Sequence, residues 1–135
     1  MNNKGFSLVE LLAVVTIISI IAIIGVVAYT KNIDYTRKKA YDTMAKSAAN
    51  AAAEYTMDNL GVTSVTLAEL TAEQYLEFPT DPASKGKACT GKVVITYVTN
   101  TNALDTEEYD VTICCSTYKA KYHFPGGTKT TATCP

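Results

Sequence analysis

The sequence of 135 residues contains one histidine, His123, and no Cys-x-x-Cys pair. Standard structural zinc sites combine closely spaced cysteine and histidine pairs, so this chain matches none of them. It also shows no Ser/His/Asp arrangement, no phosphate-binding loop and no paired acid and base, and we therefore predict no enzyme activity, no metal and no cofactor. The formal net charge of -1 argues against a strongly cationic nucleic-acid-binding protein, although a local basic patch is still compatible with it.

Proline is absent before Pro79. Because an internal proline breaks a helix, its absence permits a long uninterrupted helix in the first half of the chain. Residues 11–28 form an uncharged apolar run, which Leu8 and Val9 extend. At about 1.5 Å per residue the run spans roughly 27 Å, close to the ~30 Å hydrocarbon core of a bilayer. We predict a single membrane crossing.

The helical pattern continues beyond this run. From Ile33 onward, apolar or small residues recur in steps of three and four, at Ala40, Tyr41, Met44, Ala45, Ala48, Ala52, Tyr55 and Leu60. This spacing is typical of a helix with one buried face. With Gly61 as the terminating residue, we predict one helix from about Phe6 to Leu60. The alternative is a membrane anchor followed by a separate helix, with a break between Tyr29 and Asp34.

After Gly61, the sequence Thr66-Leu67-Ala68-Glu69 has the capping-box pattern that opens a helix, and Pro79 and Pro82 are expected to end it. Three strands are then predicted, at 92–99, 108–115 and 118–124, because each is rich in residues typical of strands and the last two alternate apolar with polar residues. Their short connections predict an antiparallel meander that closes at Pro125-Gly126-Gly127. The fold class is therefore α+β, with a long N-terminal helix packed on a small antiparallel sheet.

Four cysteines lie in the last third of the chain, Cys89, Cys114, Cys115 and Cys134. An even number in this position is typical of an oxidised extracellular module. If the first two strands form a hairpin, Cys89 lies beside the far end of the second strand, where Cys115 shares the apolar face and Cys114 points away. We favour Cys89–Cys115 with Cys114–Cys134. The other pairings, including a strained Cys114–Cys115 bond, stay open.

The apolar run is preceded by Gly5-Phe6-Ser7-Leu8-Val9-Glu10. In a secretory signal peptide the small residue at the cleavage site follows the apolar stretch, whereas here Gly5 precedes it. A cut after Gly5 would thus leave the whole helix on the mature protein. A charged residue such as Glu10 beside a membrane-spanning segment is costly and usually functional. The short basic leader, the Gly-Phe pair and a Glu at the fifth place after the cut resemble the class III leader of type IV prepilins, over residues 4–28.

This resemblance implies that a prepilin peptidase cuts between Gly5 and Phe6 and N-methylates Phe6. It implies that Glu10 faces the new Phe6 amine of a neighbouring subunit, and the alternative is a glutamate that reaches the lipid headgroups. The implied divisions are a leader at 1–5, a membrane and filament-core helix at 6–30, an amphipathic helix at 31–60 and a disulfide-bonded region at 61–135. Many pilins have a helix-breaking proline near the position of Val27, and this chain has none there. Gly25 is therefore the one intrinsic weak point of this helix.

The implied function is that of a structural subunit of a type IV pilus-like filament, with copies of itself, other pilins and the membrane as partners. The alternatives are a pseudopilin of type II secretion or competence DNA uptake, and a minor, tip-located DNA- or surface-binding pilin. The signals for the orientation of the span conflict. Only Lys4 precedes the span, whereas four cations follow it, at Lys31, Arg37, Lys38 and Lys39, so the positive-inside rule would place the C-terminal side in the cytoplasm. The cysteines and the leader favour a C-terminal region outside, on a single-pass membrane precursor that moves to the cell surface on assembly.

Two charged groups are weaker candidates. The carboxylates of Asp105, Glu107, Glu108 and Asp110 are the right chemistry for calcium, but their spacing matches no EF-hand, and we favour a solvated hairpin loop. Lys119, Lys121 and His123 share the polar face of a predicted strand. They are candidates for contact with DNA phosphates or a surface, with an ordinary soluble face as the alternative.

Overall fold

The computed structural model describes residues 5–84, 86–101 and 103–134, so positions 1–4 of the expected leader lie outside the described residues. The chain divides into two compact units, Met1–Lys38 and Lys39–Pro135. The first contains the N-terminal part of a long helix. The second contains the rest of that helix, a second short helix and a sheet.

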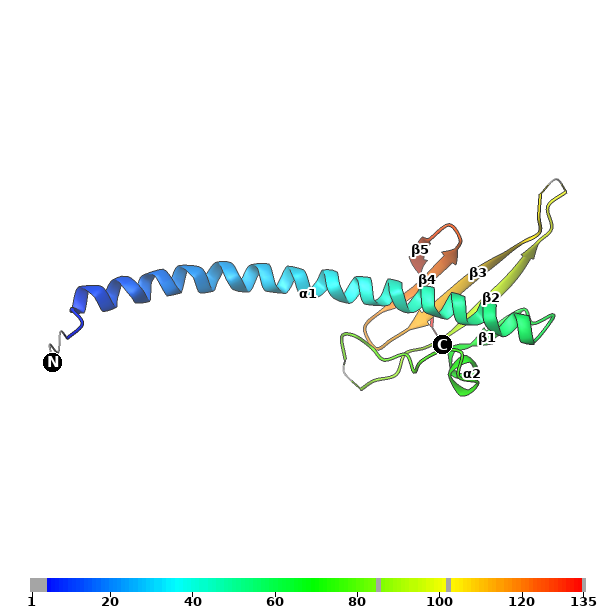
Figure 1. Ribbon diagram of the computed structural model, residues 1–135, viewed down its shortest axis with the longest axis horizontal. Helices are drawn as coiled ribbons and strands as arrows, with labels where there is room; N and C mark the ends of the chain where they lie inside the picture. The colour runs from blue at the N-terminus through cyan, green and yellow to red at the C-terminus, as the bar shows by residue number, and fades with distance from the viewer. Residues whose placement is uncertain (1–4, 85, 102, 135) are drawn as a thin grey trace. The chain divides into compact units, whose positions relative to one another are not determined.

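Helix α1 runs from Leu8 to Asp58 without interruption (Figure 1). The prediction of a single helix is confirmed to within two residues at each end, and there is no break between Tyr29 and Asp34. From Phe6 to Val26 in the first unit, the described large apolar side chains are all exposed, from 48% at Val14 to 82% at Leu8, and Ile33 further along is half-buried. Among the described residues, α1 is the one helix that is long and apolar enough to cross a membrane.

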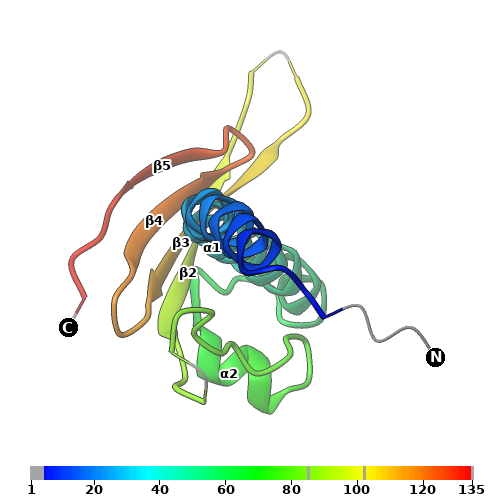
Figure 2. The same ribbon diagram turned by 90° about the vertical axis from the view of Figure 1, so that its left-hand side faces the viewer.

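The second unit contains a five-stranded antiparallel sheet in the order β1-β2-β3-β4-β5. Its strands are β1 Ser64–Thr66, β2 Thr90–Val98, β3 Thr106–Cys114, β4 Lys119–Phe124 and β5 Thr128–Thr131. Figure 2 shows the sheet along one side of the α1 residues that belong to this unit, 39–58, with helix α2, Leu67–Ala72, below β2. This is the α+β architecture that the sequence predicts.

The core of this unit lies between one face of α1 and one face of the sheet. The helix contributes mainly alanines, of which Ala45, Ala48 and Ala52 are completely buried. The sheet contributes larger residues, with Val93 and Ile95 on β2 and Val111 and Ile113 on β3. Small residues on one side and branched ones on the other allow the layers to interdigitate. The predicted apolar stripe of α1 is confirmed over this stretch, but its last member, Leu60, lies beyond the helix and is 90% exposed.

The three predicted strands are confirmed as β2, β3 and β4, paired antiparallel in sequence order, but the sheet also contains β1 and β5, which the sequence does not predict. Strand β1 is three residues long and has one buried side chain, Val65, so it carries almost no alternation signal. All four residues of β5 are exposed, and therefore no apolar period marks it. The Gly126-Gly127 turn consequently leads into another strand and does not close the sheet. Strand β2 also begins two residues earlier than predicted, at Thr90.

Helix α2 begins as predicted and ends much earlier. Its capping box is confirmed, since the Glu69 N–H donates to Thr66 Oγ1 and the Thr66 N–H donates to Glu69 Oε2. The helix stops at Ala72, before either proline. Gln74 adopts a positive φ of 64°, and the N–H of Leu76 donates to the Leu70 carbonyl. A left-handed residue with this backward bond ends a helix without any proline.

Candidate functional site

The N-terminal turn of α1 is held by two side-chain hydrogen bonds to the backbone. The Val9 N–H donates to Ser7 Oγ at 3.4 Å, and the Ser7 N–H donates to Glu10 Oε2 at 3.0 Å. The second bond is the glutamate half of a capping box, while the Ser7 hydroxyl binds the N–H of the second helical residue and not that of the third. Sequence reasoning missed Ser7, although Ser7-Leu8-Val9-Glu10 has the same pattern that marked Thr66 and Glu69. The cap places the Glu10 carboxylate at the positive end of the helix.

The expected cleavage junction lies immediately before this cap. Gly5 and Phe6 have no regular secondary structure, and Phe6 is 79% exposed. A Cβ atom placed at Gly5 would meet no atom within 4 Å. Packing within this chain therefore does not require glycine at position 5. A requirement for glycine there has to come from a molecule that binds the segment.

The apolar half of α1 satisfies its few polar atoms internally. The Thr16 hydroxyl donates to the Ala13 carbonyl at 2.8 Å, and the Ser19 hydroxyl donates to the Val15 carbonyl at 2.7 Å. In hydrocarbon an unpaired polar group costs several kcal/mol, so such internal bonds make a helix compatible with lipid. The outer surface presented by this segment is accordingly apolar on every side.

Both disulfides tie the C-terminal region together at the same end of β3. Cys89 pairs with Cys115, with 4.4 Å between the Cα atoms, and Cys114 pairs with Cys134 at 6.0 Å. This is the pairing that we favour from the sequence. Cys89 and Cys115 are buried, whereas Cys114 and Cys134 are half-buried. One bond therefore fastens the loop before β2 to the core, and the other fastens the chain end to the sheet.

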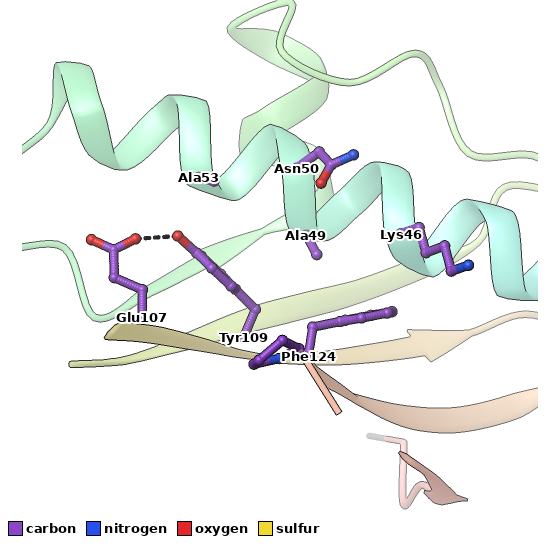
Figure 3. Close-up of a pocket in the computed structure, with 8 residues that line it drawn as sticks. Lys46, Ala49, Asn50, Ala53, Glu107, Tyr109 and Phe124 are labelled. Atoms are coloured by element: carbon purple, nitrogen blue, oxygen red, sulfur yellow. Dashed lines mark hydrogen bonds between the residues drawn. The ribbon is translucent and has the colours of Figure 1, made fainter. Parts of the chain in front are cut away.

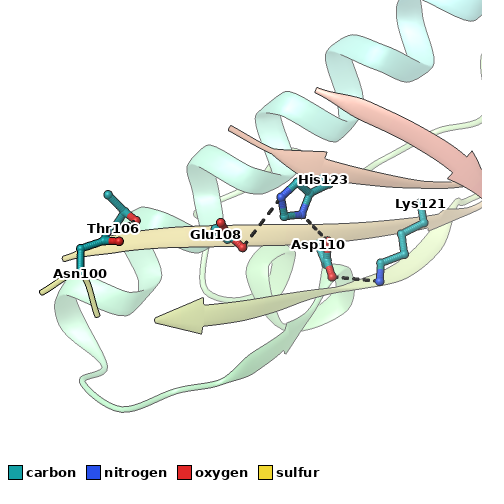
Figure 4. A network of polar contacts seen from close by, with 6 residues as sticks. All are labelled: Asn100, Thr106, Glu108, Asp110, Lys121 and His123. Atoms are coloured by element: carbon teal, nitrogen blue, oxygen red, sulfur yellow. Dashed lines mark hydrogen bonds and ion pairs between the residues drawn. The ribbon is translucent and has the colours of Figure 1, made fainter. Parts of the chain in front are cut away.

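The charged candidates on β3 and β4 pair with one another (Figure 4). Asp110 accepts from Lys121 Nζ at 2.9 Å and contacts His123 Nδ1 at 2.9 Å, while His123 Nε2 lies 3.8 Å from Glu108. Burial alone would raise the pKa of Asp110, but the hydrogen bonds from Lys121 and His123 outweigh it and lower that pKa. Two of the three predicted cations are thus matched by carboxylates of the same face, and Lys119 is exposed beside them.

The carboxylates considered for calcium do not converge. Glu108 and Asp110 face the cations just described, Glu107 accepts from the Tyr109 hydroxyl, and Asp105 accepts from the Asn100 N–H at 3.2 Å. Within residues 5–84, 86–101 and 103–134, no three His, Cys, Asp or Glu side chains are grouped in a way that could hold a metal ion.

A buried carboxylate that sequence reasoning missed anchors the loop before β2. Asp81 is 2% exposed and accepts three hydrogen bonds, from the Tyr41 hydroxyl at 2.6 Å, the Ser116 hydroxyl at 2.5 Å and the Ala83 N–H at 2.8 Å. Burial raises its pKa, but these bonds outweigh that effect and lower the pKa to about 2. Asp81 therefore joins α1, the loop and the β3–β4 connection through a single ionised group.

Comparison with protein families gives one match, over residues 1–26, to the prokaryotic N-terminal methylation motif. The match covers the expected cleavage junction, Glu10 and most of the apolar run. Comparison with curated proteins and with solved structures gives no match. This motif is the class III prepilin leader, so the N-terminal segment of the chain is that of a type IV pilin-like precursor.

Proposed function

We propose that this type IV pilin-like precursor is the structural subunit of a type IV pilus-like filament. A prepilin peptidase cuts it between Gly5 and Phe6 and N-methylates Phe6, and copies of the mature chain then assemble by helix packing. The methylation motif over residues 1–26 supports this proposal, as does the combination of an apolar helix with a disulfide-bonded sheet. Type IV pilin-like proteins are structural, so we propose no enzyme activity.

The exposed apolar half of α1 is the observation that carries the proposal. Large side chains such as Leu12, Ile18 and Ile24 are each at least 60% exposed, and they point in different directions around the helix. Lipid covers such a surface in the precursor. Outside the membrane each large apolar side chain left in water would cost about 1.5–3 kcal/mol, so the segment must be covered by the same segment of other copies. A filament with a core of these helices provides that cover.

Gly5 is assigned to recognition by the peptidase. The protein's own packing leaves open space around a Cβ at this position, so steric demand inside the chain does not explain the glycine. A peptidase that closes around the bond explains it, because a residue without a side chain allows the closest approach to the backbone. The exposed, non-helical backbone at Gly5 and Phe6 is also the form in which a chain can be cut.

Glu10 is assigned to subunit register. Cleavage would create a cation at Phe6, one residue before the N–H that Glu10 already binds. A buried amine without a partner costs several kcal/mol in a packed fibre, and the capped carboxylate of a neighbouring subunit can neutralise it. Because the cap holds the carboxylate at the helix terminus, only one axial offset between neighbours brings the two charges together.

The precursor is membrane-anchored, and we infer that its C-terminal region lies outside the cytoplasm, where the two disulfides are stable. The competing roles of pseudopilin and minor tip pilin share the N-terminal motif. The compensated charges around Asp110 give the DNA-binding role less support than the structural role, since a phosphate-binding face needs uncompensated cations.

Abundance tests the proposal. Filaments sheared from cells are separated from membranes, and the chain is quantified in both fractions against total fibre protein. A structural subunit is the dominant protein of the sheared fibres. A trace amount in fibres would instead indicate a tip pilin, and complete retention in the envelope fraction a pseudopilin, and either result would overturn the proposal.

A further inference from the structure

A cavity of about 370 Å³ lies in the second unit, between α1 and the strands β3 and β4 (Figure 3). Its helix side is formed around Lys46, Ala49 and Asn50, and its sheet side around Tyr109 and Phe124. Cavities that hold small molecules usually occupy about 300–1,000 Å³, so this one is at the small end of that range. It has room for one compact ring and not for an extended chain.

The sheet side of the cavity presents a pre-oriented aromatic ring. Phe124 is half-buried, and its ring lies parallel to that of Tyr122, with 6° between the planes and 6.3 Å between the centroids. On the opposite side Ala49 is buried and adds no bulk. A flat ligand with an apolar face can therefore lie against Phe124 without displacing any side chain.

The rim carries polar groups that the protein itself leaves unused. The side chains of Lys46 and Asn50 make no hydrogen bond or ion pair with any residue in the described part of the chain. Glu107 accepts from the Tyr109 hydroxyl and retains further acceptor capacity. Burial and this bond to Glu107 raise the pKa of Tyr109 to about 12, so its hydroxyl is protonated at neutral pH.

This combination of charges restricts the chemistry of a ligand. An anion would meet the Glu107 carboxylate, a cation would meet the Lys46 ammonium, and a purely apolar molecule would displace water from these polar groups without offering them hydrogen bonds. A neutral molecule with hydroxyl groups avoids all three penalties. If it also has an apolar face for Phe124, it uses every group that the cavity offers.

We propose that this cavity binds one pyranose ring of a neutral carbohydrate. A sugar ring presents C–H groups on its face and hydroxyl groups around its edge. The face packs on Phe124, and the edge hydroxyls exchange hydrogen bonds with Asn50, Glu107 and Lys46. This binding activity goes beyond the proposed structural role, and it does not depend on it, because all the groups belong to a single chain.

Saturation-transfer NMR on the full-length protein tests the proposal. The protein is kept in a detergent without a sugar headgroup, since a maltoside would compete for the cavity. The probes are glucose, galactose, mannose and N-acetylglucosamine, each added singly. We expect saturation transfer to the ring protons of at least one of them. Transfer to none of the four would overturn the proposal.

Two variants and a matched control locate the binding. Phe124→Leu removes the aromatic face, and Asn50→Ala removes an exposed amide that the fold does not use, so the second variant keeps the test valid if the first is unstable. We expect each to weaken binding about fivefold or more, the effect of losing one good contact. Asn32→Ala changes an exposed asparagine elsewhere on α1 and should have no effect. Binding that survives both cavity variants, or falls equally in the control, would overturn the proposal.

Discussion

The backbone N–H of Ser7 donates a hydrogen bond to Glu10 Oε2 at 3.0 Å, so the carboxylate at the start of the apolar helix is engaged by its own chain. This bond explains how an acidic residue can occupy that position in the precursor. It also means that Glu10 has two separable properties. It caps the helix as a hydrogen-bond acceptor, and in our proposal it neutralises an amine as a charge.

Glu10→Gln separates the two properties. Glutamine keeps an oxygen that can accept from Ser7 but carries no charge. We expect normal membrane insertion and cleavage, with a severe loss of filaments, because the Phe6 amine would be buried unpaired at a cost of several kcal/mol. Filament yield after shearing is the readout, and a gel shift reports cleavage.

Ser7→Ala is the matched control for capping. It removes the hydroxyl that accepts from the Val9 N–H and should destabilise the helix end by about 1 kcal/mol, with little effect on filament yield. If Glu10→Gln assembles normally, the charge of Glu10 is not needed and the proposed role in subunit register is wrong. If Ser7→Ala also abolishes filaments, the integrity of the helix end accounts for the loss.

Gly5→Ile should leave an uncleaved precursor in the membrane and abolish filaments. The expected defect is in recognition by the peptidase, because a Cβ at position 5 meets no atom of the described residues within 4 Å. Gly25→Ala is a suitable control, since a Cβ there also meets none of these atoms within 4 Å and the residue lies inside the span, away from the junction. N-terminal sequencing decides the matter: a Gly5→Ile chain that still begins at Phe6 refutes the assignment.

Asp81 should make the second unit sensitive to acid. Its pKa in the folded protein is about 2, below the ordinary value of about 3.9 in an unfolded chain. The stabilisation is therefore complete above about pH 4 and is lost as the pH falls toward 2. Asp81→Asn should lower the free energy of unfolding at pH 7 by about 1–3 kcal/mol and flatten its decline between pH 4 and 2.

Denaturation of the full-length protein in detergent, followed by the near-ultraviolet circular dichroism of its tyrosines, measures this effect. Glu77→Gln is the control, because Glu77 is exposed and its side chain makes no hydrogen bond or ion pair with the described residues. An Asp81→Asn protein with an unchanged acid profile would show that the three hydrogen bonds do not stabilise the ionised form.

The two disulfides should differ in their resistance to reduction. Cys89 and Cys115 are 4% and 6% exposed, whereas Cys114 and Cys134 are half-buried, so a mild reductant should open the second bond first. Loss of either bond should destabilise the unit by about 3 kcal/mol, given loops of 26 and 20 residues. Stepwise alkylation and peptide mapping give the order. Free thiols in the untreated protein would contradict the oxidised state.

Periodic patterns made the long helix and the three central strands predictable. The stripe of Ala45, Ala48 and Ala52 faces the core, and so do Val111 and Ile113. Strands β1 and β5 lie at the two edges of the sheet, where few side chains are buried, and the sequence therefore carries little alternation there. Strand β1 forms because β2, far along the chain, offers it hydrogen bonds, and β5 forms because the turn at Gly126-Gly127 returns the chain to β4.

Contacts between residues far apart in the sequence could not be predicted from the sequence either. Asp81 accepts from Tyr41, forty residues earlier, and from Ser116, thirty-five residues later. In the sequence, the neighbouring Pro79 and Pro82 indicate only the end of a helix. Gly91 precedes the predicted strand at 92–99, yet it lies inside β2, where only glycine fits because a Cβ would come within 2.0 Å of the Thr112 carbonyl oxygen. Ser7 differs, since Ser7-Leu8-Val9-Glu10 is a local pattern that can be read directly from the sequence.

The intact mass of this chain in filaments sheared from cells tests the central claim most directly. The account predicts a chain that begins at Phe6, carries one added methyl group on its N-terminus and has all four cysteines in disulfides. A chain that retains Gly5, lacks the methyl group or is absent from the filaments would contradict it.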